Sequence, residues 1–343
     1  MRGTLSASQS LMGNAPQPGA VASGFHAGPQ RRILVTGAVG NVGREVVRAI
    51  ALRGQVVRAA DLSIPEILAM HGAEADAVVL DYGAPETFAR AVDGCDALFL
   101  VRPPAIACME STLLPFIDAA LEHGVKHIVF LSCAGAGTNK LVPHHAVEKH
   151  LAARTRSHTL LRPGFFSQNL GAAYRHDLAH ESRLFLPAGK GRVAFVDIRD
   201  VAELAAIIFD DPVPHAGAAY NCTGPEAISF EDAARLMTDV IRRPIRYESA
   251  SIAGYVRHLH LQGLPLPQIA VQTVLHVGLR FGQSEKIDPT LERMLGRRPR
   301  TLATYVRESA ELWTPPPPVS QGRQTSPAEP PLPAWRPPSP TMA

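Results

Sequence analysis

Two patterns of apolar and polar positions take turns through the first half of the chain. Short, continuously apolar runs are typical of buried strands, and the segments between them repeat apolar residues at three- and four-residue spacing, which predicts helices. Strands without polar alternation indicate a parallel sheet that helices cover on both faces. The expected strands are 32–36, 55–60, 77–80, 97–101, 127–132 and 158–162, and the expected helices are 41–52, 64–70, 85–92, 109–123 and 145–154.

This order predicts an α/β fold with a doubly wound parallel sheet and right-handed connections. Such folds bind ligands at the carboxyl ends of their strands. The later segment carries short strand candidates at 193–197 and 218–222 together with several helices. We expect it to form a smaller C-terminal lobe on the substrate side, packed against the strand ends.

The turn after the first strand holds three regularly spaced glycines, in the order G-x-x-G-x-x-G. Glycines let the backbone turn tightly and approach phosphates, and the following helix N-terminus offers free N–H groups and a positive dipole end. We therefore predict a Rossmann-like dinucleotide site in which this turn holds the pyrophosphate, and a plain glycine turn is the alternative. The residues assigned to it are Thr36, Gly37, Gly40, Asn41, Val42 and Gly43.

An acidic residue stands where such sites bind the adenosine ribose. Asp61 ends the second expected strand, about twenty residues past the glycine turn. A carboxylate there accepts hydrogen bonds from ribose hydroxyls and repels a 2′-phosphate, so the cofactor is NAD or NADP, with NAD favoured. An ordinary turn acid before Ser63 is the alternative interpretation. Arg58 or Arg44 within reach of a 2′-phosphate would favour NADP instead.

Pattern and composition together divide the chain into four segments. Residues 1–30 are rich in Ser, Gly and Ala and are expected to be disordered, whereas 31–185 form the NAD(P)-binding Rossmann core. Residues 186–313 supply the remainder of the domain and its substrate-side lobe. Residues 314–343 are rich in Pro, a composition that predicts an extended tail without a packed core.

Charge and cysteine content argue against several other functions. The net charge of +3 is not gathered into a basic stripe, so nucleic-acid binding is not expected. Four scattered cysteines without metal-ligand spacing indicate no metal site and a reduced, cytoplasmic setting. No apolar run reaches the length of a membrane span, so no membrane partner is expected. The expected partner is a small-molecule substrate, and the sequence indicates no oligomeric state.

Further motifs follow in order along residues 31–313. The most specific is the run Leu-Arg-Pro-Gly-Phe-Phe at 161–166, with Asn169 downstream. On these motifs the chain resembles the atypical short-chain dehydrogenase/reductases, in the NmrA-like group of NAD(P)-binding proteins. The other matching segments are 35–44, 80–81, 92–100, 127–132, 144–148, 196–202 and 220–226.

The resemblance implies a role for several residues. The three glycines would hold the pyrophosphate, Asp61 the ribose and Asp81 the adenine edge. Members of the group include quinone and other NAD(P)H-dependent reductases, ergot-alkaloid dehydrogenases, and non-catalytic redox-sensing regulators that bind the nucleotide. The cofactor cleft would be lined by Val101, Arg102 and Pro103, and its nicotinamide side by Pro163, Gly164 and Phe165.

The chain departs from the wider superfamily at one important position. Relatives use a Tyr-x-x-x-Lys pair, in which the lysine lowers the pKa of the tyrosine so that it passes a proton at neutral pH. Here Lys140 stands at the tyrosine position and His144 at the lysine position. The NmrA-like group commonly lacks this tyrosine as well. The departure therefore argues against ordinary alcohol–ketone chemistry and leaves the resemblance intact.

Three residues near the expected strand ends are candidates for catalysis. His144 precedes a helical stretch beside the cleft, and an imidazole near its ordinary pKa donates a proton at neutral pH. Ser132 and Cys133 stand where relatives place a Ser or Thr that bonds the reacting carbonyl. The alternatives are a capping or packing role for His144 and a tight, buried strand end for the other two residues.

Two further residues are candidates for contact with the substrate. Phe166 would stack a flat acceptor against the nicotinamide, and an ordinary core aromatic is the alternative. Asn169 would offer a polar contact in the same cleft, with a helix cap as the alternative.

Two functions from different classes fit these features. The first is an NAD(P)H-dependent oxidoreductase that reduces a small, flat, apolar acceptor such as a quinone, which takes its proton from water. The second is a nucleotide-sensing regulator that acts through a partner protein, and the missing tyrosine favours it. An isomerase or epimerase on the same scaffold is disfavoured, because the Tyr/Lys pair is missing.

Overall fold

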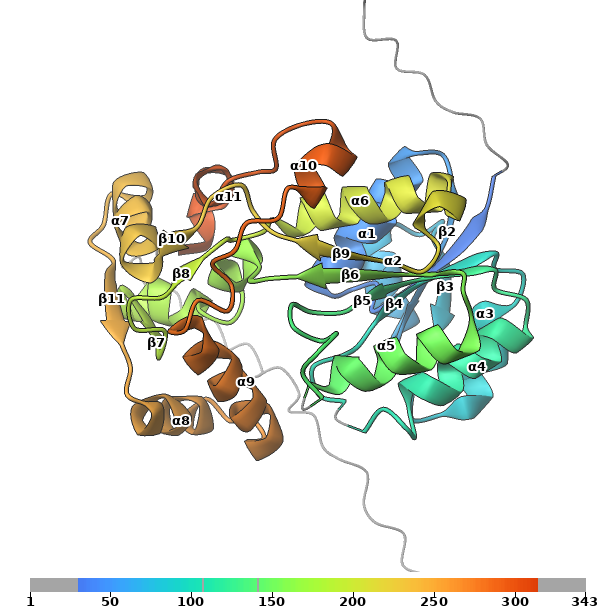
Figure 1. Cartoon of the computed structure of the whole chain (residues 1–343), viewed down its shortest axis with the longest axis horizontal. Helices are drawn as coiled ribbons and strands as arrows, with labels where there is room; N and C mark the ends of the chain where they lie inside the picture. The colour runs from blue at the N-terminus through green and yellow to red at the C-terminus, as the bar shows by residue number, and fades with distance from the viewer. Residues whose placement is uncertain (1–29, 107, 141, 314–343) are drawn as a thin grey trace, which may run out of the picture.

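A parallel sheet forms the centre of the computed structural model, which describes residues 30–106, 108–140 and 142–313 (Figure 1). Its seven strands follow the order β3-β2-β1-β4-β5-β6-β9, and each neighbouring pair is parallel. This confirms the predicted α/β class. The strands are β1 (Arg32–Thr36), β2 (Val56–Asp61), β3 (Asp76–Val79), β4 (Ala97–Val101), β5 (His127–Leu131), β6 (His158–Pro163) and β9 (Ala218–Cys222).

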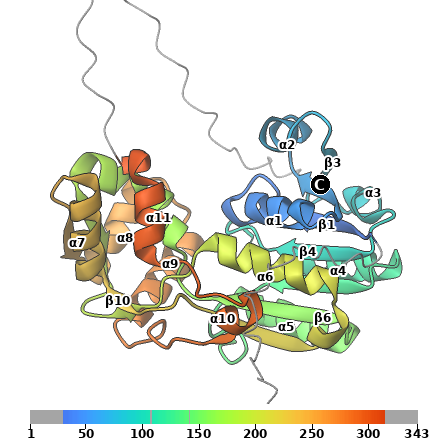
Figure 2. The same ribbon diagram turned by 90° about the horizontal axis from the view of Figure 1, so that it is seen from above.

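Helices cover both faces of this sheet, which explains why the strands are continuously apolar (Figure 2). Ile33 and Val35 of β1 pack with α1 and α6 on one face, whereas Leu34 belongs to the cluster with α4 and α5 on the other. Successive strand residues point to opposite faces, so both sets must be apolar. The covering helices are α1 (Asn41–Leu52), α2 (Ile64–His71), α3 (Phe88–Val92), α4 (Leu113–Glu122), α5 (Pro143–Arg154) and α6 (Ile198–Asp210).

A smaller lobe with its own apolar core lies beyond the strand ends (Figure 1). Phe165, Tyr174, Phe230 and Trp313 are among its buried aromatic residues. Its elements are β7 (Arg183–Leu186), β8 (Arg192–Val193), β10 (Ile228–Ser229), α7 (Phe230–Ile241), β11 (Arg246–Ser249), α8 (Ile252–Leu261), α9 (Leu266–Leu279) and α11 (Leu302–Glu308).

The chain crosses between the core and this lobe more than once. Helix α6 and strand β9 return to the central sheet, and α10 (Thr290–Leu295) packs on α6. The strand expected over 193–197 is shorter, because only Arg192 and Val193 form β8. The next backbone N–H groups bond two different segments, at Ser284 and Phe165, so no continuous ladder forms.

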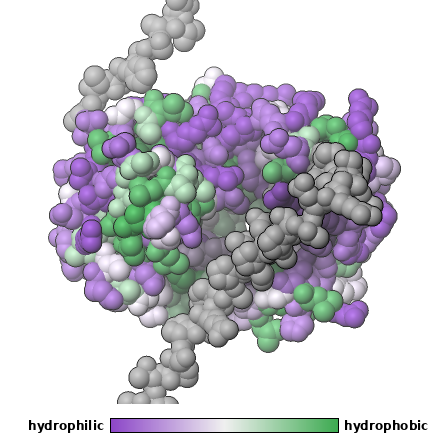
Figure 3. All heavy atoms as spheres, turned by 180° about the vertical axis from the view of Figure 1, so that it is seen from behind, coloured by the Kyte–Doolittle hydropathy of each residue, from purple (hydrophilic) through white to green (hydrophobic). Residues whose placement is uncertain are grey.

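The surface is mostly hydrophilic on the face opposite to that of Figure 1, with the largest group of hydrophobic side chains in one area and smaller groups elsewhere (Figure 3). Among the helices of the described residues, none combines the length and the apolar character that crossing a membrane requires. The predictions for residues 1–29 and 314–343 lie outside the described residues.

One buried carboxylate joins the C-terminal segment to the core. Asp200 lies in the first turn of α6 with its side chain fully buried. Its Oδ1 accepts hydrogen bonds from the guanidinium groups of Arg297, at 2.8 Å, and of Arg300. Its Oδ2 accepts the backbone N–H of Arg300 at 2.6 Å. These bonds fix the loop between α10 and α11 against α6.

We predict that Asp200→Ala lowers the free energy of unfolding by about 2–3 kcal/mol, because it removes the buried acceptor of three hydrogen bonds and leaves the guanidinium groups of Arg297 and Arg300 with Glu203 alone. Chemical denaturation measures this loss. The matched control is Glu231→Ala, which removes an exposed acid 3.3 Å from Arg235 and is expected to change stability by less than about 0.5 kcal/mol. Equal effects of the two substitutions would contradict the assigned role of Asp200.

Candidate active site

The glycine turn lies between β1 and α1 at the carboxyl edge of the sheet. The hydroxyl of Thr36 donates to the Phe99 carbonyl at 3.3 Å and accepts the Val101 N–H at 2.9 Å, which fixes the strand end. Gly37 has a φ of +64°, in the left-handed region that favours glycine. A Cβ on Gly43 would lie 2.0 Å from the Gly37 carbonyl oxygen. Glycine is therefore required at both positions.

Helix α1 begins at this turn without a side-chain cap. Gly40 is its N-cap, and in the described part of the chain no protein group accepts a hydrogen bond from the N–H groups of Asn41, Val42 and Gly43. Side-chain oxygens cap α2, α6, α7, α8 and α11, whereas α3, α4, α5, α9 and α10 lack such a cap, as α1 does. Three free N–H groups at the positive end of a helix dipole form an anion site.

Asp61 lies beside this turn, as its spacing predicts. Its Oδ2 accepts the Val39 N–H at 3.0 Å, and its Oδ1 accepts the N–H of Leu62 at 2.9 Å. The acid therefore supports the glycine turn, and its contact with a ribose stays a prediction. Asp81 lies at the end of the neighbouring strand β3, where its Oδ1 accepts the Gly83 N–H at 2.8 Å.

The two arginines that could bind a 2′-phosphate differ in how far their guanidinium groups are already occupied by other partners. Arg58 bonds Asp76 at 3.0 Å and the Asp93 carbonyl at 2.7 Å, so its guanidinium has partners away from the turn. Arg44 is partly exposed and lies 3.8 Å from Glu45. His71 of α2, which the sequence did not single out, contacts the Ala38 carbonyl through Nε2 at 3.0 Å.

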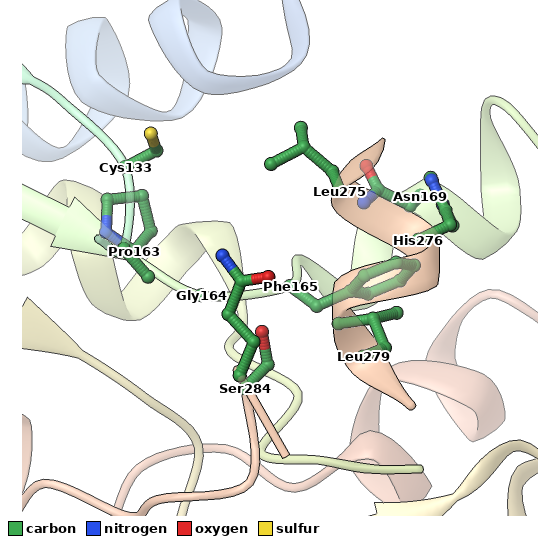
Figure 4. Close-up of a pocket in the computed structure, with 11 residues that line it drawn as sticks. Cys133, Pro163, Gly164, Phe165, Asn169, Leu275, His276, Leu279 and Ser284 are labelled. Carbon is green, nitrogen blue, oxygen red and sulfur yellow. The ribbon is translucent and has the colours of Figure 1, made fainter. Parts of the chain in front are cut away.

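A pocket with a cavity volume of about 160 Å³ opens at the same edge, beyond β5 and β6 (Figure 4). Five residues from the expected site line it, and five more come from α9 and the loop after it. One wall carries Cys133 and Pro163, and α9 forms the opposite wall (Figure 4). The expected lining residues are Cys133, Pro163, Gly164, Phe165 and Asn169, and the others, apart from Ala134, are Leu275, His276, Leu279, Gln283 and Ser284.

Two predicted contacts are placed elsewhere. Phe166 packs against the core of the sheet and is not one of the lining residues. Ser132 is buried, and its hydroxyl donates to Glu148 at 2.5 Å. Glu148 also accepts two bonds from Arg162, at 2.9 and 2.7 Å, and this partner raises the pKa of the guanidinium. These positions match the core and strand-end alternatives considered for the two residues.

A hydrogen-bonded chain connects three other candidates. Nε–H of Arg102 lies 3.4 Å from Nε2 of His144, and the imidazole Nδ1 lies 3.5 Å from the Cys133 sulfur. Burial, together with the nearby Arg102 guanidinium, lowers the pKa of His144 to about 3. The ring is therefore neutral at physiological pH, with Nε2 accepting from Arg102 and Nδ1–H donating to the sulfur. The neutral ring is not the acidic donor expected of His144, and a role for this residue in catalysis stays a prediction.

The thiol at the end of this chain is protonated as well. Burial raises the pKa of Cys133 to about 11, although the Arg102 charge acts in the opposite direction. Because the sulfur accepts from His144, its own S–H is free to point at a molecule in the pocket. Lys140, which occupies the superfamily tyrosine position, is exposed.

His276 is the principal residue that sequence reasoning missed. Its Nδ1 donates to the Gln272 carbonyl at 2.5 Å, and its Nε2 accepts from the Tyr174 hydroxyl. Burial lowers the pKa of His276 to about 4, so this ring is also neutral. Its ring meets the Phe165 ring edge-on, with centroids 5.9 Å apart. No motif marks His276, because only tertiary packing brings α9 to the strand ends.

The uncapped glycine turn, the adjacent acid and the pocket at the carboxyl edge define the class of dinucleotide-binding α/β proteins. Within that class, the chain belongs to the NmrA-like family, which matches it over residues 29–312. This confirms the resemblance.

Known proteins similar to the chain include several oxidoreductases. An uncharacterised oxidoreductase of Bacillus subtilis, YesF, is 28% identical over 289 residues, covering 83% of this chain and 97% of that protein. An NAD(P)H azoreductase of Xenophilus azovorans is 27% identical, covering 82% of this chain and 99% of its own length. The solved NADPH complex of an NADPH-dependent quinone oxidoreductase of Escherichia coli is 25% identical with a TM-score of 0.69, covering 81% of this chain and 98% of that one.

We predict that the His144 ring does not titrate between roughly pH 5 and 8 and carries its proton on Nδ1, since burial disfavours the imidazolium. Its folded pKa lies below the unfolded value, so it contributes stability at neutral pH that is lost as the pH falls toward about 3. Nitrogen-15 NMR of histidine-labelled protein measures the tautomer, and His144→Gln assigns the signal. A midpoint near pH 6.5 would contradict this account.

Proposed function

We propose that this protein is an NAD(P)H-dependent reductase of a small, flat, apolar acceptor such as a quinone. The observation that carries the proposal is the uncapped N-terminus of α1, which lies at the same edge of the sheet as a largely apolar pocket. The azoreductase and quinone oxidoreductase named above, which the chain matches over almost their whole length, support the same reaction class.

The residues of the turn fit a dinucleotide. The free N–H groups of Asn41, Val42 and Gly43 would bond the pyrophosphate, and Asp61 would bond the ribose. Repulsion between this carboxylate and a 2′-phosphate favours NAD over NADP, and Arg58 is held elsewhere by Asp76. When bound, the reduced nicotinamide supplies a hydride.

The pocket would hold the acceptor and shield part of the acceptor's surface from water. Phe165 and Leu279 offer apolar surface, and the Cys133 S–H is positioned to donate a hydrogen bond to an oxygen or nitrogen of the acceptor. A quinone that accepts a hydride needs only one further proton, which solvent can supply. The missing superfamily tyrosine is therefore compatible with this reaction.

The setting that we infer for this reaction is the cytoplasm. Cys95, Cys108, Cys133 and Cys222 are all free thiols in the described structure, as expected in a reducing compartment.

We predict that Gly40→Asp abolishes nucleotide binding without unfolding the protein. The Gly40 backbone is extended, with φ −72° and ψ 165°, so an aspartate there can cap α1 and place its charge on the anion site. Isothermal titration should show at least about a hundredfold loss for NADH and NADPH, while the melting temperature stays level or rises. Gly40→Ala is the uncharged control, since its Cβ meets only the Gly37 carbonyl, at 3.1 Å.

In the same titrations the wild-type protein should bind NADH more tightly than NADPH, and Asp61→Asn should narrow the difference. If the Gly40→Asp variant binds NADH and NADPH as tightly as the wild type, the glycine turn does not hold the pyrophosphate. A wild-type preference for NADPH would contradict the role given to Asp61.

We predict that the protein oxidises NADH with quinones and turns over simple ketones poorly. Cys133→Ala and His144→Ala should each lower kcat for a quinone by less than about tenfold, below the usual range of general acid catalysis, because solvent supplies the proton. Cys108→Ala is the control, since this thiol is exposed and does not line the pocket. Tight nucleotide binding without turnover of any acceptor would instead support a regulator, and complete loss in His144→Ala would make His144 a required acid.

A further inference from the structure

Helix α9 presents an unusual surface to solvent. Its 14 residues, Leu266 to Leu279, include no Asp, Glu, Lys or Arg. Three neighbouring apolar side chains on it, Val271, Val274 and Leu275, are 41%, 67% and 38% exposed. Surface helices normally turn charged or polar residues outward. We call these three residues the α9 strip.

The α9 strip is continuous with the pocket. Leu275 belongs to both, since it lines the pocket and remains partly exposed, and it projects toward the wall that carries Cys133 (Figure 4). Val271 lies one helical turn before Leu275 on the same side of the helix, and Val274 is the residue next to Leu275. The path out of the pocket over Leu275 therefore leads onto apolar surface.

The size of the pocket limits what it can enclose. A cavity of about 160 Å³ is smaller than the pockets of roughly 300–1,000 Å³ that enclose drug-sized ligands. Three of its lining residues, Pro163, Gly164 and Phe165, are those expected beside the nicotinamide, so the space left for the acceptor is at most that of a single small ring system. Any chain attached to that ring must leave the pocket, and Leu275 stands at its edge.

We propose that the acceptor carries an extended apolar chain, which leaves the pocket over Leu275 and lies on the α9 strip. This inference rests on the proposed function and narrows its substrate class to lipophilic ring acceptors, such as quinones with an alkyl or isoprenoid chain. The ring is reduced inside the pocket, and the chain contributes affinity outside it.

Other occupants fit this surface less well. The α9 strip, even together with Leu266, which is 69% exposed on the same helix, offers less area than the roughly 800 Å² per partner of a stable dimer interface. Helices that lie on lipid surfaces carry Lys or Arg along their polar face, and α9 has none. The first basic residue after it, Arg280, bonds inward to the carbonyls of Pro187, at 2.6 Å, and Ala250, at 3.0 Å.

The test compares one benzoquinone ring without a chain and with a ten-carbon chain. Binding is measured by isothermal titration to protein saturated with oxidised NAD, so that the result does not depend on turnover. We expect the wild type to bind the chain-bearing quinone at least about tenfold more tightly, since each buried methylene contributes about fourfold in affinity. Val271→Ser/Val274→Ser should lose this advantage and keep its affinity for the chainless ring within about twofold. Leu52→Ser is the control, because Leu52 at the end of α1 is 67% exposed, as is Val274.

The outcomes separate this inference from the proposed function. Equal affinity for the two quinones, or a chain advantage that survives in the double variant, overturns the inference even if the protein reduces quinones. A chain advantage that the double variant loses supports it even if no turnover occurs, in which case the reductase proposal alone fails. Light scattering provides a further check, since a dimer that Val274→Asp dissociates would assign the α9 strip to a second copy and overturn the inference.

Discussion

The ion pair between Glu148 of α5 and Arg162 of β6 determines the position of one whole wall of the pocket. Both residues bond through two pairs of atoms, and Ser132 at the end of β5 donates to the same carboxylate. Each of the three has a neighbour at the site. Cys133 follows Ser132, Pro163 follows Arg162, and His144 lies one helical turn before Glu148. A buried pair of this kind is poor evidence for added stability, but losing one partner is expensive. Its main effect here is to fix the ends of β5 and β6 and the helix α5 relative to one another.

The opposite wall has a different origin. Helix α9 belongs to the C-terminal lobe, and the bond between Tyr174 and His276 connects it to the segment that leaves the sheet after Phe165. The pocket is thus assembled from a wall fixed by the central sheet and a wall fixed by the lobe core. Burial keeps an imidazole neutral on each side: His144 contacts Cys133 of the sheet-side wall, and His276 is part of the lobe-side wall. The site offers polar atoms in fixed orientations and little charge, which suits an acceptor that enters uncharged.

The fold could be predicted closely because buried strands leave a simple pattern. Expected and observed strands agree within one or two residues for all six strands proposed in the first half, since residues pointing to both faces of the sheet are apolar. The positions of the glycine turn and of Asp61 could also be predicted from the sequence, because local backbone geometry dictates their spacing.

The pocket wall formed by α9 could not be predicted, since no local rule links this helix to the strand ends. The neutral state of His144 was equally hidden, because it depends on burial and on Arg102, 42 positions away. Phe166 and Ser132 show the limit of motif reasoning: neighbours in a motif can face opposite sides of a strand end.

The hydrogen bond from the Val39 N–H to Asp61 links two properties that are usually treated separately. Under the proposed function, the same carboxylate supports the loop that would bind the phosphates and would also contact the ribose at which the two nucleotides differ. A descendant of this protein cannot exchange Asp61 for a small or basic residue without also withdrawing an acceptor from its own phosphate loop. A change of coenzyme in this lineage would therefore require a second substitution that restores order to the turn, and the intermediate carrying only the first would bind both nucleotides less well. A change from NAD to NADP preference is therefore constrained by the support that the loop needs, and not only by the contacts with the ribose.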